Sequence, residues 1–133
     1  MPDAKIVKQI VAETEDKVRM LAEVTQAVAD AGANIEALCA YGMEGKAVFM
    51  IVTNDNKKAS AGLKAKGCRV KEEDVVLIGL ANRTGSASKM AKKLKEARIN
   101  LSYIYGSTSG AADAPLVFAS NDNAKAVTVL NKK

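Results

Sequence analysis

The chain has 133 residues, of which 48% are hydrophobic, which suits one compact domain or two very small ones and excludes a mainly disordered chain. It contains no histidine, the commonest general base and metal ligand, and its aromatic content of 4% leaves little surface for stacking against nucleic-acid bases. The net charge of +5 agrees with an anionic partner. The lysines are dispersed along predicted helices, however, so we expect them to solvate these helices and do not expect nucleic acid as a partner.

The first half of the chain predicts four strands and two helices in the order βαββαβ. Alternating or continuous apolar residues mark the strands, whereas the helices carry apolar residues at helical spacing and end at glycine. We expect strands at residues 6–12, 35–41, 47–53 and 68–71, one helix over 16–32, and a second helix from a cap at Asn54 or Asp55 to Gly67.

The second half predicts the same order but stops early. We expect strands at residues 75–80, 101–105 and 116–119, one helix lined by apolar residues between 87 and 97, and a second helix over 122–130. The sequence then ends at Lys133, so the second copy lacks room for its last strand. Because an uncovered sheet edge invites pairing with other strands, we expect the other repeat or a partner chain to cover it.

An internal duplication explains why both halves predict the same elements. Residues 53–59, which read TNDNKKA, return as SNDNAKA at 120–126, and residues 33–37 correspond to 99–103. The offsets of 67 and 66 residues differ by one, which places one extra residue in the turn over 106–114, where insertions are tolerated. We therefore predict two domains, over residues 1–72 and 73–133.

These elements predict an α+β fold of two tandem ferredoxin-like βαββαβ units, with antiparallel sheets that carry their helices on one face. The third strand, over 47–52, is apolar on both of its sides. Because the helices cover only one face, we expect the other face to pack against the second unit or a second subunit. The sequence thus favours an intramolecular pair, a homodimer or both.

Two segments resemble the signature of the ACT domain, which runs acidic-basic-Pro-Gly-x-Leu, then a helix, then Ala-Gly-Ile-Asn-Ile. Residues 15–24 (EDKVRMLAEV) with 31–35 (AGANI) resemble it in the first copy, and residues 82–85 (NRTG) with 97–101 (ARINL) in the second. The resemblance covers nearly the whole chain and is closest to short stand-alone tandem ACT-domain proteins. It implies a regulatory or sensor protein without a catalytic domain, which binds an amino acid or similar small ligand and acts on a regulated enzyme or regulator.

The resemblance also implies where the ligand binds, namely in the loop between the first strand and the first helix, facing a residue of a neighbouring unit. In the second copy the loop residues are Asn82, Arg83, Thr84 and Gly85, and the facing residue is Asn100. Gly85 lets a ligand approach free backbone N–H groups that favour a carboxylate, and Arg83 can add a charge-assisted hydrogen bond. The alternative is that the loop is only a turn with a capping residue.

The first copy departs from the family pattern. Its loop residues are Asp16, Lys17, Val18 and Arg19, and its facing residue is Asn34. Arg19 stands where the family has glycine, and Val18 where proline is common. We expect this site to be degenerate and the first copy to act as a scaffold, although the Arg19 guanidinium could instead meet a carboxylate directly.

No motif indicates catalysis, because the sequence lacks a nucleophile elbow, a phosphate-binding glycine loop and an evident carboxylate pair. Cys39 and Cys68 lie 29 residues apart without metal-ligand spacing, so we expect free thiols, no metal and no cofactor. No apolar stretch suits a signal peptide or a membrane span, and we expect a cytoplasmic protein. Two alternatives stay open: an interaction module with a vestigial ligand site and, with less support, an RNA-binding βαββαβ module.

Overall fold

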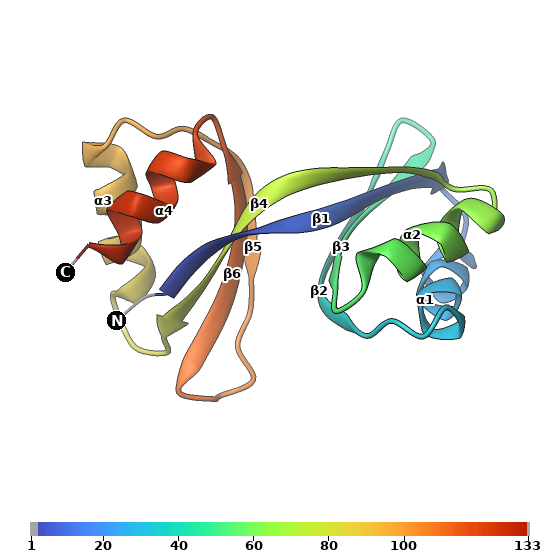
Figure 1. The fold of residues 1–133 in the computed structure, drawn as a ribbon, viewed down its shortest axis with the longest axis horizontal. Coiled ribbons are helices and arrows are strands. Elements are labelled where there is room, and N and C mark those ends of the chain that lie inside the picture. Colours follow the sequence, from blue (N-terminus) through green and yellow to red (C-terminus); the bar gives the residue numbers. More distant parts are fainter. Residues whose placement is uncertain (1–2, 133) are drawn as a thin grey trace. The chain divides into compact units, whose positions relative to one another are not determined.

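The computed structural model describes residues 3–132, and its elements follow the predicted order (Figure 1). The strands are β1 (Asp3–Glu15), β2 (Ile35–Met43), β3 (Lys46–Thr53), β4 (Arg69–Ala81), β5 (Leu101–Gly106) and β6 (Asp113–Ser120). The helices are α1 (Met20–Asp30), α2 (Asn56–Ala65), α3 (Ser86–Glu96) and α4 (Asn123–Asn131). The last strand of the first copy and the first strand of the second are one continuous strand, β4, because no turn residues separate them.

The chain divides into two compact units. We call residues 8–73 the first-copy unit, and residues 3–7 together with 74–132 the second-copy unit. The division after residue 73 lies one residue from the boundary that the repeat predicts. Residues 3–7, which the repeat assigns to the first copy, instead group with the second-copy unit.

The first residues of β1 complete the second-copy unit. Ala4 is 3% exposed and belongs to the apolar core of that unit. Its N–H donates a hydrogen bond to Oδ1 of Asn131 (2.8 Å), and its C=O accepts one from Nδ2 of the same side chain (2.9 Å). Because β1 neighbours β4 in the sheet, residues 3–7 take the place of the last strand that the second copy lacks.

In the first-copy unit, β3 lies between β2 and β1 and is antiparallel to both. Helices α1 and α2 cover one face of this sheet, and the core between them contains Ile10, Val28, Phe49 and Leu63. Residues 47–53 of β3 are all buried. Both faces of this strand are therefore covered, as its apolar sequence predicts.

The second-copy unit is built in the same way. Strand β6 lies between β4 and β5 and is antiparallel to both. Helices α3 and α4 cover one face, and the core contains Ile78, Met90, Leu94, Phe118 and Leu130. Two tandem α+β units of ferredoxin-like topology, the second without a last strand of its own, are thus confirmed.

The repeated Asn-Asp-Asn motif fixes the start of the second helix in each unit. In the first copy, Asp55 caps α2, because its Oδ1 accepts a hydrogen bond from the N–H of Lys58 (3.2 Å). The Oδ1 of Asn56 accepts from the N–H (3.1 Å) and the hydroxyl (2.6 Å) of Thr53. The Nδ2 of Asn56 donates to the carbonyl of Lys8 (2.9 Å), which ties α2 to β1.

The second copy repeats these bonds one by one. Asp122 caps α4 by accepting from the N–H of Lys125 (3.0 Å). The Oδ1 of Asn123 accepts from the N–H (3.0 Å) and the hydroxyl (2.7 Å) of Ser120, and its Nδ2 donates to the carbonyl of Asp74 (3.0 Å). The strongest repeat in the sequence is therefore explained by folding, not by ligand chemistry.

Candidate functional site

The second-copy loop, residues 82–85, connects β4 to the start of α3. Gly85 is the residue before the helix and has φ of +88°, a left-handed conformation that glycine adopts without strain. The main-chain N–H groups of Thr84 and Gly85 donate no hydrogen bond to any described residue. The loop therefore presents free donors at the positive end of a helix dipole, which is a favourable place for an anion.

Asn82 and Arg83 have different roles in this loop. The N–H of Asn82 donates to the carbonyl of Ala112 (2.8 Å), and its Nδ2 donates to the carbonyl of Ala111 (2.9 Å). The Asn82 amide therefore holds the loop against the connection between β5 and β6. The side chain of Arg83 is exposed and forms no hydrogen bond or ion pair with residues 3–132, so its guanidinium is available to a ligand.

Asn100 lies at the other end of α3, just before β5. Its N–H donates to Oδ1 of Asn121 (3.1 Å), and its carbonyl accepts from the N–H of Asn121 (3.0 Å). The helix between Asn100 and the second-copy loop rises by about 16 Å, at 1.5 Å per residue. Within its own unit, Asn100 is therefore not brought together with residues 82–85.

Two depressions lie beside the second-copy loop. The larger has a volume of about 530 Å³ and is lined by cations, hydroxyl groups and glycine: Arg83, Thr84, Gly85, Ser86, Ser88, Lys89 and Lys92. The smaller, of about 240 Å³, lies between the loop and the β5–β6 connection, and combines apolar and polar residues: Leu80, Ala81, Asn82, Arg83, Ser86, Ala87, Gly106, Ser107, Thr108, Ala114 and Leu116. Arg83 and Ser86 belong to both, and neither contains an acidic residue.

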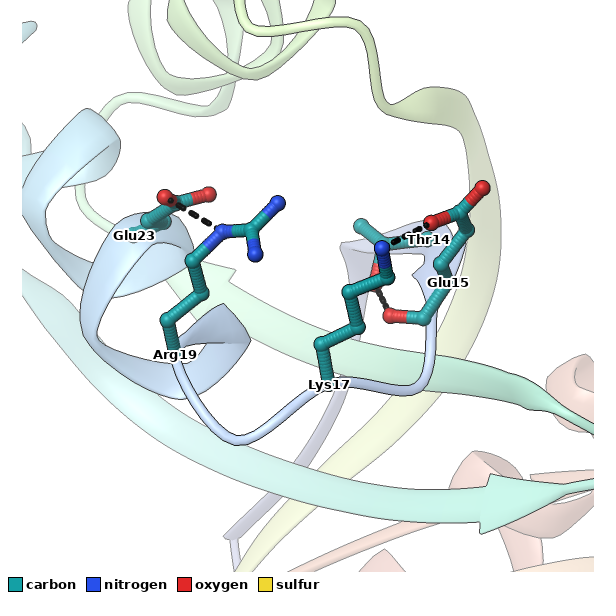
Figure 2. Close-up of polar contacts among 5 residues, drawn as sticks. All are labelled: Thr14, Glu15, Lys17, Arg19 and Glu23. Atoms are coloured by element: carbon teal, nitrogen blue, oxygen red, sulfur yellow. Dashed lines mark hydrogen bonds and ion pairs between the residues drawn. The ribbon is translucent and has the colours of Figure 1, made fainter.

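The first-copy loop, residues 16–19, neutralises its own cations. The Nε of Arg19 donates to Oε1 of Glu23 (3.0 Å), and the Nζ of Lys17 pairs with Glu15 (3.1 Å), as Figure 2 shows. Arg19 precedes α1 at the position that Gly85 has before α3, but with an ordinary φ of −79°. Val18 is fully exposed.

The remaining first-copy candidates are engaged in the fold through their main chains. The N–H of Asp16 donates to the carbonyl of Gly45 (3.1 Å). The N–H of Asn34 donates to Oδ1 of Asn54 (2.8 Å), and the N–H of Asn54 donates to the carbonyl of Asn34 (3.1 Å), as in the second copy. The two loops thus differ in their side-chain cations, because Lys17 and Arg19 are paired with carboxylates in the first copy and Arg83 is unpaired in the second.

Sequence reasoning missed Lys89 and Lys92, which it assigned to helix solvation, and Ser107 and Thr108, which lie in the predicted turn over 106–114. The two lysines lie three and six residues after Ser86, so they share the helix face that begins at the second-copy loop. This spacing is the sequence signal from which the two lysines could have been identified. Nothing in the local sequence places Ser107 and Thr108 next to Asn82, because this contact depends on the β5–β6 connection folding back.

Three further features of residues 3–132 are the grouping of metal-binding side chains, the thiols and the length of the apolar helices. No three His, Cys, Asp or Glu side chains there are grouped so that they could hold a metal ion. Cys39 and Cys68 are free and partly buried, and burial is the main cause that raises the pKa of the Cys68 thiol. No helix in the same range is long and apolar enough to cross a membrane.

Comparison with known proteins adds a family and a set of similar folds. Residues 5–133 match the family model described as an ACT domain pair. Among solved structures, protein BT0572 from Bacteroides thetaiotaomicron is 27% identical with a TM-score of 0.88, over 96% of this chain and 88% of that one. The ligand-free regulatory subunit of aspartate kinase from Thermus thermophilus is 14% identical with a TM-score of 0.69, over 96% and 93%. No curated protein is similar enough to count as a match.

Proposed function

Because the chain belongs to the ACT domain family, we propose that it senses an amino acid, which binds at the second-copy loop, and that it passes this signal to a regulated enzyme. A small-molecule-binding regulatory role is what the family has in common. The amino-acid ligand, the homodimer, the regulated partner and a cytoplasmic site of action are the further steps of this proposal.

The observation that carries the proposal is the set of unused donors at residues 83–85. Thr84 and Gly85 present free N–H groups, and Arg83 presents an unpaired guanidinium. A carboxylate can accept from both kinds of donor, and hydrogen bonds to a charged group are the stronger ones. The α-carboxylate that all amino acids share is the smallest ligand group that uses this set.

Asn100 has a place in this proposal only if a neighbouring unit completes the site. Its side-chain amide forms no hydrogen bond with described residues, and an amide offers both a donor and an acceptor to a zwitterion. We propose that an Asn100 side chain faces a second-copy loop across a homodimer. The aspartate kinase regulatory subunits with similar folds are separate regulatory chains by name, which supports action on a partner enzyme.

We propose that the first-copy loop does not bind a ligand. Arg19 and Lys17 are already paired with carboxylates of neighbouring residues, so an added carboxylate would have to displace these ion pairs. The first-copy unit then serves as a scaffold, and each chain binds one ligand.

The test is a thermal-shift screen of the protein against the common amino acids, each at up to about 5 mM, which covers the weak end of what so small a ligand can reach. A ligand at about one hundred times its Kd stabilises the folded state by about 2.7 kcal/mol, which is easily detected. Calorimetry on the hit then compares Arg83→Ala with Arg19→Ala, which removes the arginine of the first-copy loop. We expect Arg83→Ala to weaken binding about tenfold or more and Arg19→Ala to leave it unchanged.

Two results would contradict the proposal. Binding that survives Arg83→Ala but is lost in Arg19→Ala would move the site to the first copy. If no amino acid shifts the melting temperature, the sensor proposal fails, and a pure interaction module becomes the better account. A stable oligomer without any small-molecule response is what such a module would show.

A further inference from the structure

The two loop–helix segments of the repeat carry opposite charge. Residues 82–100 contain six basic residues and one acidic residue, which gives +5, whereas residues 16–34 contain two basic and three acidic residues, which gives −1. These segments occupy equivalent places in the duplicated fold, so folding alone does not require the difference. Three of the six basic residues, Arg83, Lys89 and Lys92, line the depression beside the second-copy loop.

The cations next to the second-copy loop have no partners. Arg83, Lys89 and Lys92 are exposed, and none of them forms an ion pair or a side-chain hydrogen bond with residues 3–132. All three line the larger depression, and no acidic residue lines either depression. Three unpaired positive charges around one concave surface repel one another, and they also raise the local concentration of anions.

The first copy serves as an internal control for this argument. The cations of its loop, Lys17 and Arg19, lie at 3.1 Å from Glu15 and 3.0 Å from Glu23. The same fold can therefore neutralise its loop cations locally, and it does so where we propose that no ligand binds. In the second copy the positions equivalent to Glu15 and Glu23 hold Ala81 and Lys89, so these two carboxylates are not repeated there.

We propose that the ligand of the second-copy loop is an amino acid whose side chain carries a further negative group, either a carboxylate or a phosphate. This inference rests on the proposed function and names its ligand class. The α-carboxylate accepts from Arg83 and the free N–H groups, while the side-chain anion lies toward Lys89 and Lys92, further along α3. A basic amino acid would meet like charges there and is excluded.

Calorimetry with matched ligand pairs tests this inference. The pairs are aspartate with asparagine, glutamate with glutamine, and O-phosphoserine with serine, so each pair differs mainly in the second anion. An exposed ion pair contributes up to about fivefold in affinity, so two lysines are expected to favour the acidic member by up to about 25-fold. Comparing aspartate and glutamate with O-phosphoserine then shows whether the second anion is a carboxylate or a phosphate.

Lysine variants test which residues cause the preference for the acidic ligand. Lys89→Gln and Lys92→Gln should each weaken binding of the acidic ligand by up to about fivefold and leave the neutral member of the pair nearly unchanged. Lys95→Gln is the matched control, because Lys95 is an exposed lysine of the same helix that lines neither depression. It should leave both ligands unaffected.

Each remaining outcome overturns the inference. If neutral amino acids bind as well as the acidic ones, the sensor function stands and the ligand class is wrong. If the acidic preference persists in both lysine variants, the second anion is recognised elsewhere. If inorganic phosphate competes as strongly as O-phosphoserine, the site recognises an anion only. If no ligand of either class binds, the proposed function fails together with the inference.

Discussion

Replacing Asn123 by alanine should separate the folding role of the Asn-Asp-Asn motif from any ligand role. The side chain makes three hydrogen bonds, two with Ser120 (3.0 and 2.7 Å) and one with the carbonyl of Asp74 (3.0 Å). At about 1 kcal/mol net for each bond, their loss costs about 3 kcal/mol. The higher helix propensity of alanine returns about 0.5 kcal/mol, so the free energy of unfolding should fall by about 2.5 kcal/mol.

Equilibrium urea denaturation measures this change. With a slope of about 2 kcal/mol per molar urea, the unfolding midpoint should fall by about 1 M. Lys125→Ala is the control, because Asp122 accepts from the main-chain N–H of Lys125, which the substitution keeps. That variant should stay within about 0.5 kcal/mol of the parent protein. If Asn123→Ala and Lys125→Ala lose the same stability, the reasoning about this motif is refuted.

Three further predictions concern glycines and a thiol. Gly85→Ala should lower the free energy of unfolding in urea by about 1 to 2 kcal/mol, because φ of +88° strains any residue with a Cβ. An unchanged unfolding midpoint would show that the loop relaxes. Gly106→Ala should lower the free energy of unfolding by about 1 to 3 kcal/mol, because the added methyl group would collide with the Leu116 side chain. Gly79→Ala should lower it less, because a methyl group there has no neighbour within 4 Å. Equal losses in the two variants would contradict this reasoning. Since burial raises the pKa of Cys68, its thiol stays protonated to higher pH, and it should react with iodoacetamide more slowly than free cysteine at the same pH.

The order of elements could be predicted because the repeat supplied each half with the other as a template. Apolar residues alternate within 35–41 and are continuous within 47–52, and the motif at 53–59 returns at 120–126. The sequence also predicts that the other repeat or a partner chain covers the open sheet edge of the second copy, and residues 3–7 of the other repeat do so, but which residues exchange could not be predicted. It depends on one small buried residue, Ala4, and on its hydrogen bonds to Asn131, which lies 127 positions away in the sequence.

In the candidate site, too, features that depend on neighbouring residues in the sequence were predicted, and features that depend on distant residues were not. The family resemblance indicated residues 82–85, and the structure shows free donors at Thr84 and Gly85. Asn82 is less available than the sequence suggested, because its amide holds the β5–β6 connection. Periodicity marks Lys89 and Lys92 as exposed, but exposure alone does not say that a helix face borders a loop. Only the fold brings those lysines and the loop to one depression.

The most direct test of the central claim is a ¹H–¹⁵N NMR titration of the full chain with pools of the common amino acids, each at about 5 mM. If the second-copy loop binds the α-carboxylate, the amide signals of Thr84 and Gly85 should shift most, because their N–H groups gain an acceptor. The signals of residues 17–19 in the first copy should stay in place. Shifts confined to the first copy, or no shift at any amide, would contradict the account.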